Sequence, residues 1–214
     1  MSNYPKVNYI GNKEKLVSWL IREMPVRSGT VLDLFAGGSS VAYALKEHGY
    51  SVLVNDILYA DYVLAKALVE NETETLDVSV FQRTVLQERE RELEEKFSFL
   101  AKRLYFPEEI AELAHLVAIS ETLSGNERYL FLALIRRAMI RKLPYSRMNV
   151  PWNQIQRLRD EDYSYAKYGR RRAYHNQTFE SGKICRRTMM QYFKGNPVRL
   201  IGVMLWSWQI RCKR

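Results

Sequence analysis

The strongest constraint on the fold is a short apolar run that leads through a glycine-rich turn into a helical pattern and a second apolar run. Residues 30–35 have the length and composition of a buried strand, and residues 36–40 read Ala-Gly-Gly-Ser-Ser. A helical pattern covers residues 41–48, and Gly49 separates it from a second short strand at residues 51–56. Two strands joined by a crossover helix run parallel, so this region is predicted to be a βαβ unit of an α/β fold.

Two carboxylates accompany the glycine turn. Asp56 ends the second strand, 19 residues beyond Gly37, and this spacing places it beside the turn, where it can accept hydrogen bonds from both hydroxyls of a ribose. Asp33 lies inside the first strand, where a charged group needs either a polar ligand or backbone amides around it. An acid on each strand suits a nucleoside with a cationic amino acid portion, such as S-adenosylmethionine. The dinucleotide fingerprint Gly-x-Gly-x-x-Gly is absent.

Beyond this unit the apolar spacing predicts helices and few strands. The expected helices cover residues 13–23, 59–71, 82–104, 108–120 and 127–141. The helix at 82–104 alternates acidic and basic residues, which is typical of a solvated structural helix. The sequence after Pro144 has little periodicity and is predicted to be rich in loops.

Composition excludes several classes of protein. The chain has 214 residues, of which 47% are hydrophobic and 27% charged, so it is not expected to be disordered or fibrous. It contains no apolar run long enough to span a membrane and no apolar signal core near its first residue, which predicts a cytoplasmic protein. Two cysteines without a histidine cluster predict neither a disulfide framework nor a metal site.

Charge is distributed unevenly along the chain. Residues 1–135 contain 14 basic and 20 acidic residues, a net charge of −6, whereas residues 136–172 contain 11 basic and 3 acidic residues, a net charge of +8. Residues 181–214 add 8 basic residues and no acidic one. The basic segment also carries the aromatic residues Tyr145, Trp152, Tyr163, Tyr165 and Tyr168. Cations in this number can neutralise the charges of a polyanion, so the basic segment predicts a polyanionic partner.

Four segments carry a family resemblance because they occur together and in order. They are Asn8-Tyr-Ile-Gly-Asn-Lys13, Asp33-Leu-Phe-Ala-Gly-Gly-Ser-Ser40, Asn55-Asp56 and Arg147-Met-Asn-Val-Pro-Trp152. Over about residues 5–180 the chain resembles the Dam-like group of DNA adenine-specific methyltransferases. The resemblance implies a Rossmann-like S-adenosylmethionine-dependent methyltransferase sheet, complete or incomplete, with a helical and loop-rich DNA-recognition region.

The resemblance also implies site residues. Tyr9 would pack near S-adenosylmethionine, Lys13 would contact its carboxylate and Asp33 its amino group. Phe35 and Gly37 would form the turn, and Asp56 would bind the ribose. The alternatives are a core aromatic for Tyr9, a solvated lysine for Lys13 and a helix-capping or hydrogen-bonded acid for Asp33.

The DNA-contacting residues are expected in the basic segment. Arg147, Asn149 and Trp152 fall in the family-like segment, and Arg170, Arg171 and Arg172 form the densest cationic cluster. The alternative for that cluster is a charge that serves solubility alone. Together these features divide the chain into a cofactor-binding part at 1–75, a helical segment at 76–135, a DNA-recognition region at 136–180 and a divergent basic tail at 181–214.

Two departures from the family pattern stand out. Ser39 occupies the position of a usual glycine, so the turn must accept a Cβ atom there. The Asp/Asn-Pro-Pro-Tyr/Phe tetrapeptide with which the family holds the adenine amine is missing, since Leu143-Pro-Tyr145 and Gly195-Asn-Pro-Val198 each lack part of it. No catalytic residue is therefore assigned. We expect a sequence interrupted before the catalytic motif, with an out-of-frame or divergent tail, and a chain that is inactive or nearly so by itself.

The predicted function is methylation of adenine N6 at specific sites in duplex DNA, in restriction-modification or genome marking. A cognate restriction endonuclease or a second methyltransferase fragment would be the protein partner. The alternatives are a non-catalytic DNA-binding remnant or accessory subunit, and a methyltransferase acting on RNA or a small molecule, which the segment Asn149-Val-Pro-Trp152 disfavours.

Overall fold

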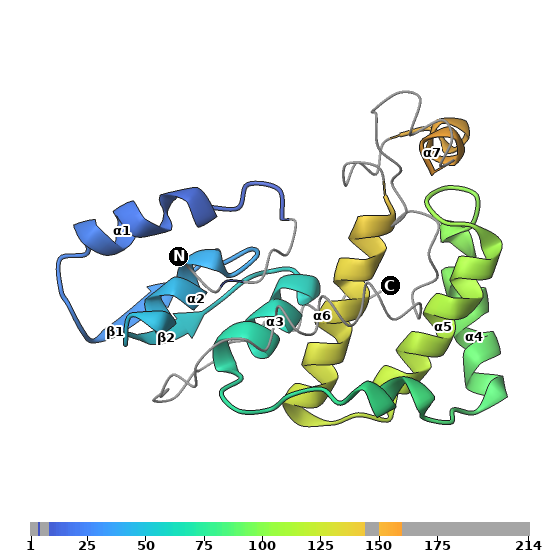
Figure 1. Cartoon of the computed structure of the whole chain (residues 1–214), viewed down its shortest axis with the longest axis horizontal. Coiled ribbons are helices and arrows are strands. Elements are labelled where there is room, and N and C mark those ends of the chain that lie inside the picture. Colours follow the sequence, from blue (N-terminus) through green and yellow to red (C-terminus); the bar gives the residue numbers. More distant parts are fainter. Residues whose placement is uncertain (1–3, 5–8, 144–149, 160–214) are drawn as a thin grey trace, which may run out of the picture. The chain divides into compact units, whose positions relative to one another are not determined.

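The computed structural model of the chain describes residue 4, residues 9–143 and residues 150–159 (Figure 1). These residues belong to two units, the first ending at Thr75 and the second beginning at Leu76. Each unit has its own hydrophobic cluster and is treated separately below.

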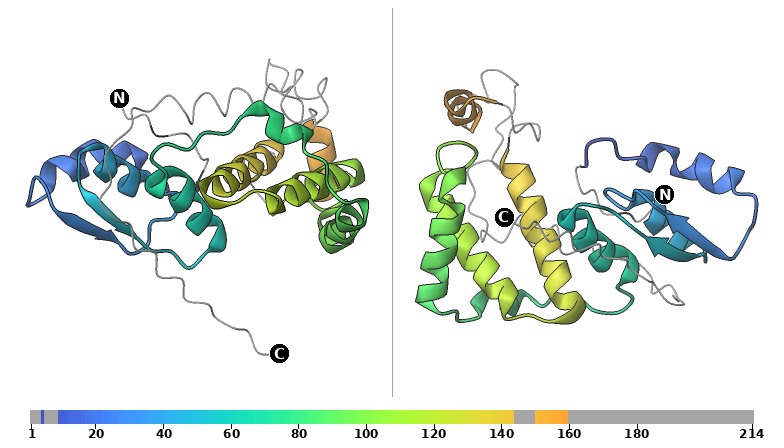
Figure 2. Two further views of the ribbon diagram at one scale, coloured as in Figure 1. Left: turned by 90° about the horizontal axis from the view of Figure 1, so that it is seen from below. Right: turned by 180° about the vertical axis from the view of Figure 1, so that it is seen from behind.

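The first unit contains the expected βαβ arrangement. Its elements are η1 (Glu14–Leu16), α1 (Val17–Glu23), β1 (Thr30–Asp33), α2 (Ser40–Glu47), β2 (Ser51–Val54), α3 (Tyr59–Ala65) and the π-helical η2 (Lys66–Glu70). The two strands pair in parallel, with Thr30 opposite Ser51 and Asp33 opposite Val54. The prediction of parallel strands with a crossover helix is confirmed. Among the described residues the sheet has these two strands (Figure 2).

The core of this unit forms between α2, β2 and the helices that follow. Alternate residues of β2, Val52 and Val54, are buried against Ala42 and Leu45 of α2 and Val69 of η2. Successive side chains of a strand point to opposite faces, so burial of every second residue indicates that one face of β2 is covered. β1 is more exposed than β2, since none of its residues is fully buried.

A buried lysine fastens α2 to the end of η2. The ammonium of Lys46 donates hydrogen bonds to the carbonyl of Val69 at 2.7 Å and to that of Asn71 at 2.6 Å. Burial lowers the pKa of Lys46 to about 8, although the nearby Glu72 opposes this shift. The cation thus satisfies carbonyl groups that the end of a helix leaves unpaired.

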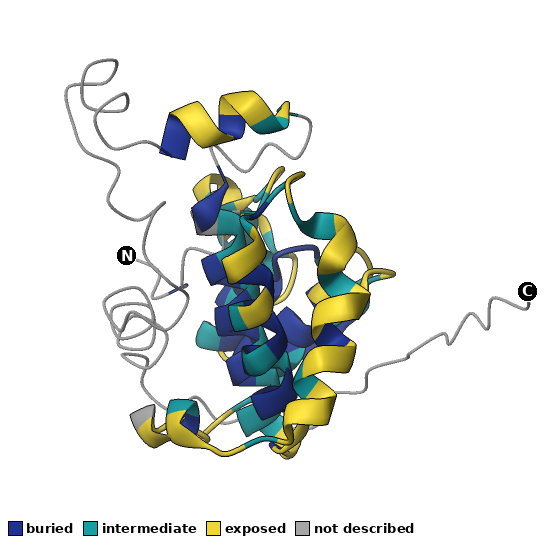
Figure 3. Ribbon diagram, turned by 90° about the vertical axis from the view of Figure 1, so that its right-hand side faces the viewer, coloured by how far each residue is buried: buried dark blue, intermediate teal, exposed yellow. Residues whose placement is uncertain are grey.

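The described part of the second unit is helical. Its elements are η3 (Val78–Gln82), α4 (Gln87–Phe97), η4 (Ser98–Leu100), α5 (Pro107–Glu121), α6 (Gly125–Lys142) and α7 (Trp152–Arg159). In Figure 3 the buried residues lie mainly on the facing sides of the helices and the exposed residues on their outward sides. One cluster of the core joins Leu93 of α4 to Ala114 and Ala118 of α5.

The charged helix is shorter than predicted. Its α-helical part covers Gln87–Phe97 instead of 82–104, because a 3-10 turn follows and the backbone turns at Lys102, which has a φ of 54°. Leu93 is its one buried residue, as expected for a solvated helix. Arg89 joins it to α5 through a bidentate ion pair with Glu121, with N–O distances of 2.8 and 2.7 Å.

The helix α6 includes residue 136, in agreement with the expected helix at 127–141. The region after Pro144, which was predicted to be rich in loops, also contains the helix α7. Its buried face is formed by Ile155, Leu158 and Arg159. Because one of these three residues is charged, the hydropathy pattern does not show the spacing of a helix.

Candidate functional site

The glycine turn connects β1 to α2 and is held by Asp56. The Gly37 amide donates a hydrogen bond to Oδ2 of Asp56 at 2.8 Å, and the Leu58 amide donates to its Oδ1 at 3.1 Å. One carboxylate therefore ties the turn to the segment that enters α3. The proximity of Gly37 and Asp56 that the spacing predicted is present. Each carboxylate oxygen has a second lone pair, so Asp56 retains acceptor capacity for the hydroxyls of a ligand.

Tyr9 lies directly against the turn. A Cβ atom added to Gly37, which has a φ of +50°, would lie 2.8 Å from Cε1 of Tyr9, and one added to Gly38 would lie 2.9 Å from its Cβ. The Tyr9 hydroxyl donates to Oδ2 of Asp61 in α3 at 3.1 Å. The two glycines are therefore required by the close approach of this ring, and not only by the approach of a ligand.

Tyr4 is a contact of the turn that the sequence did not indicate. Its hydroxyl donates a hydrogen bond to the Gly38 carbonyl, and its ring packs edge-on against Tyr43 of α2, with 5.6 Å between centroids. No periodicity marks a residue in an irregular segment, so a pattern search had no signal to use. The segment before α1 thus reaches the turn at two points, through Tyr4 and Tyr9.

Ser39 adopts the backbone conformation that a glycine would favour. It has a φ of 63° and a ψ of 22°, in the left-handed region, and its side chain is buried. Within the described part of the chain its hydroxyl has no hydrogen-bond partner. The turn does accept the Cβ atom, at a conformational cost of about 1 kcal/mol.

Asp33 is half-buried at the end of β1. Burial raises its pKa, hydrogen bonds from the Phe35 and Ala42 backbone lower it in part, and the negative charge of Asp56 raises it further, so that the pKa lies above its usual value. These backbone hydrogen bonds are compatible with the alternative of a hydrogen-bonded acid, while the N-cap of α2 is Ser39. A cation placed beside Asp33 would also be favoured, because it would offset the repulsion from Asp56.

Exposed apolar side chains follow the ends of both strands. Phe35 is 87% exposed, and Ile57, which the sequence analysis did not single out, is 84% exposed. Both lie just beyond the carboxyl ends of paired parallel strands, where ligands bind in open α/β sheets. Lys13 is exposed immediately before η1, and within the described residues its side chain forms no hydrogen bond.

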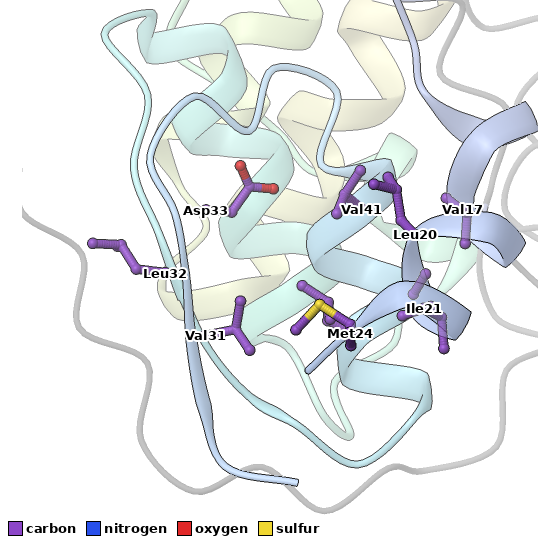
Figure 4. A pocket seen from close by; sticks show the side chains of 10 residues that line it. Val17, Leu20, Ile21, Met24, Val31, Leu32, Asp33 and Val41 are labelled. Atoms are coloured by element: carbon purple, nitrogen blue, oxygen red, sulfur yellow. The ribbon is translucent and has the colours of Figure 1, made fainter. Parts of the chain in front are cut away.

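An apolar recess lies beside the turn, between α1, β1 and α2. Figure 4 shows Val17, Leu20 and Ile21 of α1 around it, with Asp33 as the one oxygen-bearing side chain among those labelled. Its volume is about 160 Å³, and typical ligand pockets measure about 300–1,000 Å³. The recess is too small for a nucleoside joined to an amino acid, so the exposed edge of the turn is the candidate cofactor surface.

The second unit holds the expected DNA-contacting residue Trp152. Its ring is half-buried at the start of α7 and packs edge-on against Phe106, with 5.0 Å between centroids. The guanidinium of Arg159 lies 4.6 Å from the centroid of the same phenyl ring. The five other expected DNA contacts, Arg147, Asn149, Arg170, Arg171 and Arg172, lie outside the described residues.

A buried ion cluster fixes α7. Glu109 of α5 accepts hydrogen bonds from Lys142 of α6 at 2.6 Å and from Arg159 of α7, whose Nη1 lies 2.7 Å from Oε2. Burial would raise the pKa of Glu109, but the hydrogen bonds and charges of Arg159 and Lys142 outweigh it and lower the pKa below its usual value. Sequence reasoning missed this cluster because its members are 33 and 50 residues apart.

The described residues hold no set of three His, Cys, Asp or Glu side chains suited to a metal ion. None of the helices described is both long and apolar enough to cross a membrane.

Comparison with known proteins identifies the family. Residues 9–192 match the family model of the D12 class N6 adenine-specific DNA methyltransferases. The chain is 45% identical over 189 residues to the type II methyltransferase M2.HphI of Haemophilus parahaemolyticus, an alignment that covers 83% of this chain and 52% of the relative. It is 38% identical over 71 residues to the type II methyltransferase M.NlaIII of Neisseria lactamica, covering 30% of this chain and 21% of that relative.

No solved structure is matched significantly. The chain spans about half the length of the Haemophilus relative. With a family match over most of its length, the chain belongs to the D12 class of N6 adenine-specific DNA methyltransferases.

Proposed function

We propose that this chain supplies the cofactor-binding and DNA-recognition parts of a site-specific DNA methyltransferase. The enzyme would transfer a methyl group from S-adenosylmethionine to N6 of adenine in a restriction-modification system. The observation that carries the proposal is the hydrogen bond between Asp56 and the Gly37 amide, in a chain of this family. It brings an acid and a glycine turn together at the carboxyl edge of parallel strands, where nucleosides bind.

The residues at this edge suit S-adenosylmethionine chemically. Asp56 would accept hydrogen bonds from the ribose hydroxyls, and Asp33 would lie near the ammonium group. Lys13 would contact the carboxylate. The exposed side chains of Phe35 and Ile57 are apolar surfaces on which the adenine ring can pack. When bound, the cofactor supplies an electrophilic methyl group on a sulfonium centre.

We propose duplex DNA as the substrate and the cytoplasm as the place where the enzyme acts. The net charge of +8 over residues 136–172 suits a polyanion, and both relatives are named type II methyltransferases. The exocyclic amine of adenine is a poor nucleophile, because its lone pair is delocalised into the ring. An enzyme must extrude the base and accept hydrogen bonds from the amine.

The tetrapeptide that performs this task in the family does not occur in residues 1–214. We propose that the protein partner is a cognate restriction endonuclease or a second methyltransferase fragment. The alternative is a DNA-binding accessory chain without catalysis.

The test is transfer of a tritiated methyl group from S-adenosylmethionine to duplex DNA. The chain is assayed alone and together with a polypeptide that spans the half of the Haemophilus relative that it does not cover. We expect little incorporation by the chain alone, and adenine-specific incorporation by the mixture that Asp56→Ala abolishes. No incorporation by a mixture of two folded polypeptides would favour the accessory chain. Equal incorporation into single-stranded RNA would contradict the substrate.

A further inference from the structure

We infer that the exposed face of α7 reads base edges in the major groove of duplex DNA. This inference rests on the proposed function and assigns DNA recognition to four residues that were not among the expected contacts: Asn153, Gln154, Gln156 and Arg157.

The first support is the way α7 is anchored. Its buried side carries Ile155, Leu158 and Arg159, and Arg159 is joined to Glu109 at 2.7 Å while stacking on Phe106. Lys142, at the end of α6, is paired with the same carboxylate. A helix that is fixed by a buried bidentate contact presents its opposite face in a defined orientation, as specific recognition requires.

The second support is the composition of the opposite face. Asn153, Gln156 and Arg157 are spaced i, i+3 and i+4, so they share one side of the helix, and Gln154 lies beside Arg157 one turn away. All four residues are exposed. Within the described part of the chain, the side chains of these four residues form no hydrogen bond or ion pair. Their amide and guanidinium groups are available to a ligand.

The chemistry of this face matches DNA bases. Asn and Gln form bidentate hydrogen bonds with N6 and N7 of adenine, and Arg does so with O6 and N7 of guanine. An α-helix has a diameter of about 10–12 Å with its side chains, and the major groove is about 12 Å wide. The helix α7 contains no acidic residue that would repel phosphates.

A solvated surface helix is the alternative, and α4 shows what such a helix looks like in this chain. Its residues Glu88, Glu90, Glu92, Glu94 and Glu95 make it strongly acidic, and its Arg89 is engaged by Glu92 and Glu121. The exposed face of α7 has amides and a cation without acids. Charge complementarity therefore favours a polyanion on α7 and disfavours one on α4.

The experiment compares matched substitutions on the two helices in the full chain. Gln154→Ala, Gln156→Ala and Arg157→Ala are compared with Gln87→Ala and Arg91→Ala, which alter exposed residues of the same types on α4. The probe is a pool of duplexes with a randomised core, from which bound DNA is separated by mobility shift and sequenced. Circular dichroism verifies that each variant is folded.

We expect each α7 variant to lose at least about fivefold in preference at one or more base positions, the loss of one bidentate contact. The α4 variants should retain the affinity and base preference of the unmodified chain. Folded α7 variants with unchanged affinity and unchanged preference would overturn the inference, and so would a uniform loss of affinity with preserved preference, which marks phosphate contacts only. If the unmodified chain bound no DNA, the proposed function would fail instead, so the two failures are distinguishable.

Discussion

The two units fix their functional elements by different physical means. In the first unit the Asp56 carboxylate accepts a hydrogen bond from the Gly37 amide, and the Tyr9 ring packs closely against Gly37 and Gly38. In the second unit α7 is held by side-chain charge, through Glu109, Lys142 and Arg159. A turn that must let a ligand approach needs small residues and close packing, whereas a helix that must display side chains needs an anchor on its far face.

This difference implies different sensitivities. The turn should respond to added volume and to changes in backbone conformation, because its neighbours are already at van der Waals contact. The anchor of α7 should respond to the loss of a charge and to acid, because a buried cation without its partner is expensive. The predictions below test this contrast.

The largest effect is expected for Glu109→Gln. Removing the charge of the carboxylate that Lys142 and Arg159 share weakens a buried ion cluster, which should lower the free energy of unfolding by about 3–5 kcal/mol. Urea denaturation measures this loss. Glu108→Gln, a change at the exposed neighbouring position of α5, is the control and should have little effect. A Glu109 variant as stable as the control would show that the anchor is not electrostatic.

The same cluster predicts a pH dependence. The pKa of Glu109 is lower in the folded chain than in the unfolded one, so its contribution to stability is fully present above the unfolded pKa. It is lost as the pH falls through the lowered folded value. Unfolding curves recorded from neutral to acidic pH should therefore converge for the unmodified chain and Glu109→Gln. If the difference in unfolding free energy between the unmodified chain and Glu109→Gln stayed constant in acid, the lowered pKa of Glu109 would be contradicted.

A smaller effect is expected for Gly37→Ala. The new methyl group would meet Cε1 of Tyr9 at 2.8 Å and would also sit at a φ of +50°, and overpacking alone reduces stability by about 1–3 kcal/mol. Gly49→Ala is the matched control, since Gly49 has a φ of +83° but no atom within 4 Å of the added Cβ. The Gly49→Ala variant should lose only about 1 kcal/mol of unfolding free energy, because alanine is strained in the left-handed conformation. Equal losses of stability for Gly37→Ala and Gly49→Ala in thermal unfolding would mean that Tyr9 does not restrict the turn.

The smallest effect is expected at Ser39. Ser39→Gly should raise the free energy of unfolding by up to about 1 kcal/mol, because glycine adopts the left-handed conformation without the steric cost that serine has. The greater freedom of glycine in the unfolded chain offsets part of this gain. Ser39→Ala keeps the Cβ atom and removes a hydroxyl that has no partner among the described residues, so it should be nearly neutral. A destabilising glycine would show that the Ser39 hydroxyl has a role in the turn.

The features that the sequence predicted well depend on local spacing. The strand, turn and helix lengths impose parallel pairing, and parallel pairing brings Asp56 to Gly37, so both followed from residues 30–56 alone. The family resemblance singled out Tyr9, whose ring lies against the turn, and its contact with the cofactor stays a prediction. The interpretation of the charged helix as solvated was sound, although its ends were misplaced because 3-10 turns leave little trace in a hydropathy pattern.

The features that were missed depend on long-range pairing. Arg159 and Lys142 are buried and paired with Glu109, which lies in another helix, whereas a hydropathy pattern treats both cations as exposed. The helix α7 went unrecognised for the same reason. Tyr4 was missed because its hydrogen bond to the Gly38 carbonyl spans 34 residues.

The most direct test of the account is calorimetric titration of the intact chain with S-adenosylmethionine. Asp56→Ala and Asp56→Asn are measured beside Asp77→Ala, which alters an exposed acid of the second unit. Loss of hydrogen bonds to a charged group weakens binding by about tenfold or more. We predict saturable binding of one cofactor by the unmodified chain and by Asp77→Ala, and at least this loss in both Asp56 variants. Absence of binding by the folded, unmodified chain, or equal affinities in all four proteins, would contradict the account.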